Sequence, residues 1–151
     1  MKPPDDDYSL RYSWTEGSIP PPHHYEYDIL FDSTGKGSVA MIPDYPGQDV
    51  PCWTEPFAVA PDAARDLLAL MVSEGLLTRK WRAVPRPPVG GSHAWLTVTA
   101  AGRQIKVPPF PLKSQQEHAA KIFVAVRALV PQSVWDKLDA QRQLYIQGHQ
   151  G

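Results

Sequence analysis

The sequence predicts an α+β fold, in which an antiparallel sheet of five to seven strands, built from two hairpins, carries two or three helices on one face. Three observations lead to this prediction. Residues 24–32 alternate between large apolar and polar side chains, which is typical of a half-buried strand. Residues 61–75 and 115–130 repeat apolar residues at helical spacing. The chain has 17 prolines among 151 residues, and they cluster between these segments.

The first half of the chain predicts four strands. Residues 8–15 alternate, and a triple-proline loop separates them from the strand at 24–32. In that second strand we expect an aromatic and aliphatic core face made of Tyr25, Tyr27, Ile29 and Phe31. Leu30 is the one apolar residue on the opposite face. A glycine-bearing turn at 32–37 leads into a strand at 38–43, and a fourth strand at 53–59 carries Pro56, which suits a sheet edge.

The second half predicts three helices and a second hairpin. Pro61 and Gly75 are typical of the first and last positions of a helix. Residues 78–84 suggest a further strand, and residues 93–99 with 104–107 suggest the hairpin. The patterns Ser-Gln-Gln-Glu at 114–117 and Ser-Val-Trp-Asp at 133–136 match capping boxes at the starts of the second and third helices.

Length and composition favour a single domain over residues 1–151, with frayed ends at 1–7 and 148–151. A single cysteine excludes an internal disulfide and fits a reducing compartment, so we expect a cytoplasmic protein. No apolar run is long enough to cross a bilayer, which argues against a membrane partner.

Charge is divided unevenly along the chain, although the net charge is only −1. Residues 1–62 hold three basic and eleven acidic residues, whereas residues 63–151 hold twelve basic and five acidic residues. The two halves could attract each other within one fold. Alternatively, they could form separate faces, the basic one meeting an acidic partner.

One face of the predicted second strand carries a histidine and two carboxylates, namely His24, Glu26 and Asp28. Same-face neighbours on a strand lie roughly 6.5–7 Å apart, so one metal ion would need further ligands from an adjacent strand. A solvated polar face explains the same pattern. We therefore predict no metal site, and these three residues remain the candidates if there is one.

Three other segments have both a chemical and a structural interpretation. Cys52 could be a nucleophile, but no base is selected by the sequence, and a buried or incidental thiol explains it. The Gly-Gly-Ser-His run at 90–93 could hold an anion through its backbone amides, or be a tight loop. The basic run 79–82 with Arg86 could contact nucleic acid, yet alternation would split it between two faces, and residues 82–88 match an SH3-ligand pattern.

The order of segments between residues 24 and 130 resembles that of emfourin, a small bacterial protein inhibitor of metallopeptidases. In both, a hairpin leads into a helix that begins Asp-Ala-Ala-x-x-Leu, here residues 62–67, and a second hairpin and a closing helix follow. The extra N-terminal strand, the loop at 20–22 and the third helix depart from that pattern, so no inhibitory residue is carried over. The chain also resembles an uncharacterised bacterial protein family, which implies no activity.

These observations favour a non-enzymatic protein-binding or inhibitor-like domain without a cofactor. The expected partner is another protein rather than nucleic acid, and the oligomeric state is left open. Stiff proline loops lose little entropy on binding, so we expect the contact surface at two loops and one exposed tryptophan. Its residues are Pro20, Pro21, Pro22, His23, Arg86, Gly90, Gly91, Ser92, His93 and Trp95. The alternative is a small enzyme or a ligand- or metal-binding protein that uses the face of His24, Glu26 and Asp28.

Overall fold

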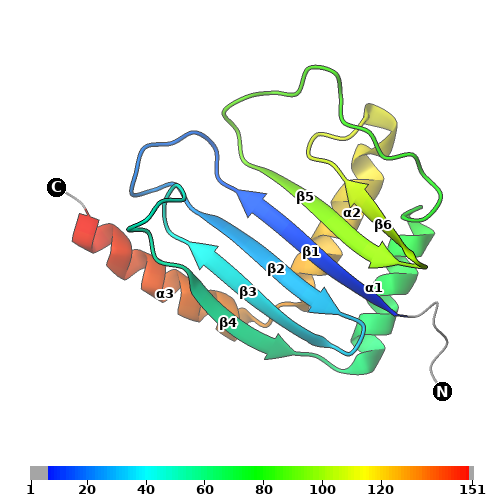
Figure 1. The fold of residues 1–151 in the computed structure, drawn as a ribbon, viewed down its shortest axis with the longest axis horizontal. Coiled ribbons are helices and arrows are strands. Elements are labelled where there is room, and N and C mark those ends of the chain that lie inside the picture. The colour runs from blue at the N-terminus through cyan, green and yellow to red at the C-terminus, as the bar shows by residue number, and fades with distance from the viewer. Residues whose placement is uncertain (1–6, 150–151) are drawn as a thin grey trace.

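A six-stranded antiparallel sheet forms one layer of the molecule and three helices form the other (Figure 1). The structure is a computed structural model and describes residues 7–149. The elements in chain order are β1 (Tyr8–Thr15), β2 (Glu26–Asp32), β3 (Lys36–Ile42), β4 (Trp53–Ala58), α1 (Pro61–Ser73), β5 (His93–Ala100), β6 (Arg103–Val107), α2 (Lys113–Leu129) and α3 (Gln132–His149). The predicted α+β class is therefore confirmed.

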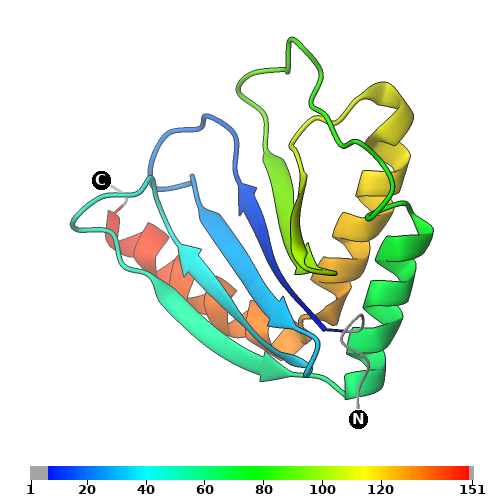
Figure 2. The same cartoon turned by 45° about the vertical axis from the view of Figure 1, so that its right-hand side comes forward.

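Strand β1 lies inside the sheet, where it pairs with β2 on one side and with β5 on the other. The sheet order is β4-β3-β2-β1-β5-β6, so the first four strands form a meander that ends at the β4 edge. Helix α1 then takes the chain behind the sheet to the far side of β1, where β5 and β6 form the second hairpin (Figure 2). Pro56 lies on the edge strand β4, as predicted, where its missing N–H breaks no ladder.

The predicted alternation sorts the strand side chains into two faces. Tyr27, Ile29 and Phe31 are buried beneath the helices, and Tyr25 is half-buried beside them. The other core side chains of the strands are Tyr8, Leu10, Tyr12, Val39, Met41, Phe57, Leu96, Val98, Ile105 and Val107. Helix α3 packs behind β4, and α1 lies beside α2 (Figures 1 and 2). None of the helices between residues 7 and 149 lies on the opposite side of the sheet, which we call the open face.

Helix α1 ends as its sequence predicts. Gly75 has a φ of +92°, in the left-handed region that glycine adopts without a side-chain clash. The N–H of Gly75 donates to the carbonyl of Val72, and the N–H of Leu76 donates to that of Met71. These two bonds form a Schellman motif, and Leu76 is fully buried as the apolar contact that accompanies it.

The strand predicted at residues 78–84 does not form. Only an isolated bridge joins Ala83 to Pro111, where two backbone hydrogen bonds link residues 82 and 84 to residues 110 and 112, and a side chain fixes the residues before it. Gln115 of α2 is buried, accepts a hydrogen bond from the N–H of Arg82, and donates one to the carbonyl of Lys80. Residues 80–82 therefore bond partly to the Gln115 amide and partly, through the Arg82 carbonyl, to the backbone N–H of Leu112. These contacts form no continuous ladder with a neighbouring strand.

Helix starts also differ from the predicted capping boxes. Helix α2 begins at Lys113, and no side chain caps its N-terminus, so the box at 114–117 is wrong. Its third residue, Gln115, uses its amide to hold the segment before it. Helix α3 begins at Gln132 and continues to His149, so residues 148 and 149 are helical instead of frayed. The predicted ends at 1–6 and 150–151 lie outside the described residues, and Asp7 directly precedes β1.

The two ends of the sheet carry different connections. At one end lie the long segments 16–25, 43–52, 78–92 and 108–112, and we call this the loop end. At the other, the turn end, short turns join β2 to β3 and β5 to β6. None of the helices between residues 7 and 149 has both the length and the apolar character needed to cross a bilayer.

We expect the buried tyrosines to make the fold sensitive to alkaline pH. Burial raises the pKa of Tyr8, Tyr12 and Tyr27 above the usual 10.0. The unfolded chain therefore loses these protons near pH 10 while the folded chain keeps them, so the free energy of unfolding falls as pH rises above 10. The loss should approach about 1.4 kcal/mol per tyrosine for each further pH unit. Urea denaturation between pH 9 and 11 measures this loss of unfolding free energy. In Tyr12→Phe the free energy should fall less steeply with pH. A free energy of unfolding that does not change with pH in the wild type would contradict the raised tyrosine pKa values.

The turn between β5 and β6 offers a stabilising substitution. Ala101 has a φ of 52° and Gly102 a φ of 73°, the two positive values of a type I′ hairpin turn. Alanine is strained in this region, whereas asparagine tolerates it. Ala101→Asn should raise the free energy of unfolding by roughly 0.5–1 kcal/mol. Thermal denaturation measures the change, and Ala101→Val, whose branched side chain is worse here, should lower the midpoint.

Candidate functional site

The two proline loops predicted as a contact surface lie side by side at the loop end. Strand β1 runs antiparallel to both neighbours, so its end at Thr15 lies beside the starts of β2 and β5. The segment after β1 and the segment before β5 must therefore leave the sheet together. The N–H of Ser18 donates to the carbonyl of Gly90 at 2.9 Å and joins the two loops directly.

Gly17 is the point of closest approach between these loops. A Cβ atom on this residue would lie 2.2 Å from the carbonyl oxygen of Gly90, well inside van der Waals contact. Gly17 is also buried, and its own carbonyl faces a ring nitrogen of His24. The absence of a side chain at Gly17 is therefore what allows the two loops to meet.

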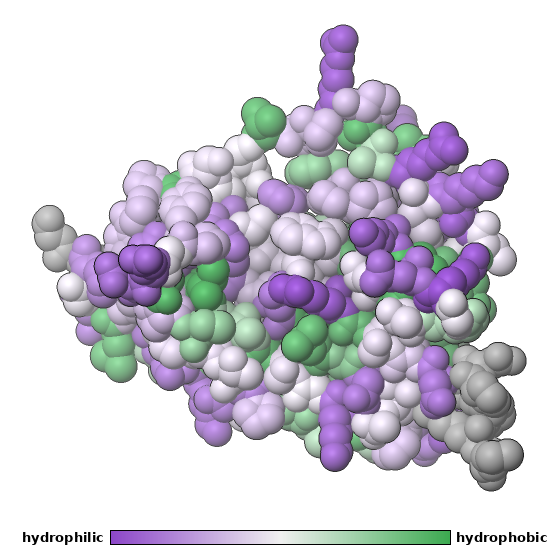
Figure 3. Space-filling view, viewed as in Figure 1, coloured by the Kyte–Doolittle hydropathy of each residue, from purple (hydrophilic) through white to green (hydrophobic). Residues whose placement is uncertain are grey.

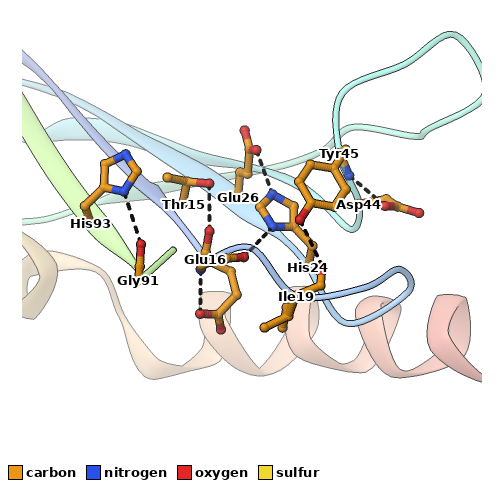
Figure 4. Close-up of polar contacts among 10 residues, drawn as sticks. Thr15, Glu16, Ile19, His24, Glu26, Asp44, Tyr45, Gly91 and His93 are labelled. Atoms are coloured by element: carbon orange, nitrogen blue, oxygen red, sulfur yellow. Dashed lines mark hydrogen bonds and ion pairs between the residues drawn. The ribbon is translucent and has the colours of Figure 1, made fainter. Parts of the chain in front are cut away.

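His24 joins three parts of the loop end, as Figure 4 shows. Its Nδ1 lies 3.1 Å from the Gly17 carbonyl oxygen, and its Nε2 lies 2.8 Å from Oε2 of Glu26. The Tyr45 ring stacks on the imidazole with centroids 3.7 Å apart, and the Tyr45 hydroxyl donates to the carbonyl of Ile19. His24 is only 3% exposed, so it is a buried structural residue and not the solvated one that the strand pattern predicted.

This arrangement brings His24 and Glu26 together but leaves Asp28 apart from them. β2 begins at Glu26, so His24 precedes the strand and both of its ring nitrogens are engaged. The Asp28 carboxylate instead accepts a hydrogen bond from the Arg11 guanidinium at 2.7 Å. Over residues 7–149, no three histidine, cysteine or acidic side chains lie close enough together to hold a metal ion. His24 and Glu26 thus contact each other, whereas Asp28 is held separately by Arg11.

An arginine that the sequence analysis missed fixes the other side of the proline loop. Arg142 of α3 donates to the carbonyl of His23, and its guanidinium lies 3.9 Å from the centroid of the Tyr25 ring. Residues 23 and 142 are far apart in sequence, and nothing in the pattern of α3 singled this arginine out. It ties the loop to the helical layer, so the loop is held from both sides.

Trp95 lies on the open face at this end of the sheet. It is 37% exposed, and its ring stacks against His93 with centroids 5.5 Å apart. His93 in turn contacts the ring of Phe110 at 5.6 Å. Ser13, the cross-strand partner of Trp95, is 5% exposed although no helix covers this face, so neighbouring side chains shield it. The indole is therefore both accessible and held in place.

Two hollows border this tryptophan and the joined loops. One, of about 440 Å³, lies on the open face and is lined by Trp95, Arg11, Asp28 and the exposed Cys52. The other, of about 350 Å³, lies between the loops and is lined by His24, His93, Phe110 and the backbone of the glycine pair at 90–91. Figure 3 shows the open face as a mixture of hydrophilic side chains and small hydrophobic patches.

The predicted contact residues lie at the surface. Pro22 and His93 are half-buried, and the exposed ones are Pro20, Pro21, His23, Arg86, Gly90, Gly91, Ser92 and Trp95. Val89, which the sequence analysis did not select, is 94% exposed in the same loop. The basic run at 79–82 is separate from them and partly fixed to the end of α1. There Arg79 donates to the carbonyl of Glu74, and Trp81 donates to that of Leu76.

Replacing Gly17 should separate the loops. In Gly17→Ala the new methyl group collides with the Gly90 carbonyl, so the Ser18–Gly90 hydrogen bond breaks and the free energy of unfolding falls by roughly 1–3 kcal/mol. Gly91→Ala is the matched control, because a Cβ at Gly91 has no atom within 4 Å. Amide hydrogen exchange at Ser18 should increase only in the first variant; equal exchange in both would contradict this account.

No family model matches the sequence, and no curated protein matches it either. The similarity in segment order to emfourin-type inhibitors therefore stays a prediction. What this chain does has to follow from the arrangement of its own side chains.

Proposed function

We propose that this chain is a small, non-enzymatic domain that binds another protein through its loop end. The observation that carries the proposal is the position of Trp95, which is exposed on an uncovered sheet face and held by His93 beside the two joined loops. Tryptophan is among the residues that contribute most to protein interfaces, because a large rigid ring buries much apolar area at little entropic cost.

The order of the surrounding loops supports binding rather than turnover. Hydrogen bonds hold the segment 17–24 at four points: Ser18 to Gly90, His24 to Gly17, Tyr45 to Ile19, and Arg142 to His23. A surface that is already ordered loses little conformational entropy when a partner docks. Peptidase inhibition, which the segment order suggests, is one form that such binding can take. The lone cysteine fits action in a reducing compartment, and we propose the cytoplasm.

The alternative of an enzyme or metal protein on His24, Glu26 and Asp28 has less support. A general base needs a ring nitrogen that can reach a substrate proton, and both nitrogens of His24 face protein oxygens. Asp28 is paired with Arg11. Cys52 is exposed, but no histidine contact accompanies it among the interactions of the described residues.

Removing the indole tests this proposal. Proteins captured from the native cell extract by the wild-type chain are identified by mass spectrometry, and the affinity of the enriched protein is then measured for each variant. Trp95→Ala should weaken binding by about 2 kcal/mol, or roughly 30-fold. Leu144→Ala is the control, because Leu144 is an exposed apolar residue of α3, 69% exposed and remote from this face.

Circular dichroism before and after each substitution confirms that the variants keep the wild-type fold. Equal affinity of wild type and Trp95→Ala for the captured protein would refute the proposed surface. So would conversion of a low-molecular-weight substrate by this purified chain itself, since that result belongs to an enzyme.

A further inference from the structure

A second part of the open face, at the turn end, has a different chemistry. A hollow of about 670 Å³ lies there, with the basic residues Arg11, Lys36 and Lys106 along it. Leu30 lies among them and is 47% exposed, the apolar residue that interrupts the polar face of β2. This hollow adjoins the one beside Trp95, because Arg11 and Thr97 line both.

The cations of this hollow are more available than its carboxylates. Lys36 and Lys106 are exposed and make no ion pair within the described part of the chain. Of the nearby acids, Asp28 is bound to Arg11 at 2.7 Å. Asp32 accepts hydrogen bonds from the backbone and hydroxyl of Thr34 in its own turn. With the Arg11–Asp28 pair neutral, Lys36 and Lys106 outnumber Asp32, so the net charge that the hollow presents to an incoming group is positive.

Hydroxyl groups surround these cations and face the same space. Ser9 is the direct cross-strand partner of Thr99, and Arg11 that of Thr97. Ser9, Thr97 and Thr99 line the hollow, and within residues 7–149 their hydroxyls bond to no other protein group. Such hydroxyls donate to carboxylate oxygens, which only accept. The hollow thus offers one ligand both positively charged groups and neutral hydroxyl hydrogen-bond donors.

The spacing of the cations sets the size of that ligand. Lys36 is on β3 and Lys106 is on β6, four strand steps apart in the sheet order. At about 4.8 Å per step, their Cα atoms are roughly 19 Å apart, with Arg11 on the central β1 between them. A single small anion cannot reach all three. An extended polypeptide, at roughly 3.3 Å per residue, needs about six residues to do so.

We propose that the turn-end hollow binds an extended acidic segment of the partner protein, with carboxylates on Lys36 and Lys106 and an apolar side chain on Leu30, over the neutral Arg11–Asp28 pair. This inference rests on the proposed protein-binding function and adds the chemistry of the partner. A continuous phosphate chain fits less well. Such a chain carries a charge at every nucleotide, so it would place phosphates beside Asp28 and Asp32 of β2, whereas a peptide can place uncharged residues there.

The test uses three defined probes at low salt, where charge interactions are least screened. They are a fluorescein-labelled peptide of four Glu-Leu-Ser repeats, the same peptide with Gln in place of Glu, and a labelled 12-mer of deoxythymidine. Fluorescence anisotropy should show binding of the acidic peptide, at least tenfold weaker binding of the Gln peptide, and loss of affinity as salt is added.

Charge reversal locates the site. The double variant Lys36→Glu with Lys106→Glu should lower the affinity for the acidic peptide at least tenfold. The matched control is Lys113→Glu with Lys137→Glu, which changes the net charge equally at two exposed lysines on α2 and α3. This control should bind within about twofold of wild type, because these lysines are outside the hollow.

Two results would overturn the inference. One is an acidic peptide that fails to bind or binds both double variants equally. The other is an oligonucleotide that binds the wild type more tightly than the peptide does and no longer binds the double variant of Lys36 and Lys106. That result would identify a nucleic-acid surface. Neither result depends on Trp95, so the loss of partner affinity in Trp95→Ala is judged separately.

Discussion

The pairing of β1 with both β2 and β5 is the constraint on which the rest of this structure depends. It joins the N-terminal meander to the C-terminal hairpin in a single sheet. It also brings the connection after Thr15 next to the segment that enters β5, so that Ser18 can bond to Gly90. The proximity of two loops that are some 70 positions apart in sequence is therefore a result of strand order.

The buried face of the sheet is aromatic but not entirely apolar, and its polar atoms are used. The Tyr8 hydroxyl donates to the carbonyl of Ala64 at 2.6 Å and ties the start of β1 to α1. Tyr12 packs edge-on against Phe123 of α2, and Tyr27 packs in the same way against Trp135 of α3. Each helix thus contacts a different ring of the sheet, which fixes its position as well as burying apolar area.

The uneven distribution of charge along the chain does not produce two separate bodies. β5 and β6 belong to the basic half of the sequence, yet they continue the sheet begun by the acidic half. On the open face, the acidic residues of β2 lie between basic residues of β3, β1 and β6. Arg11 and Asp28 neutralise each other at the centre, which leaves positive charge toward the turn end and the indole toward the loop end.

Most of the secondary-structure elements, and the face that each strand buries, can be predicted from the sequence; the strand expected at 78–84 is the exception. Alternation at Tyr27, Ile29 and Phe31 and the glycine at position 75 act over a few residues, so local pattern is enough to predict them. The burial of His24 could not be predicted in this way. It results from tertiary contacts with Gly17 and Tyr45, which belong to other segments of the chain. The hydrogen bonds of residues 80–82 to Gln115 also depend on the tertiary structure, since Gln115 belongs to a helix distant in sequence. Both depend on contacts between remote segments, which no periodicity records.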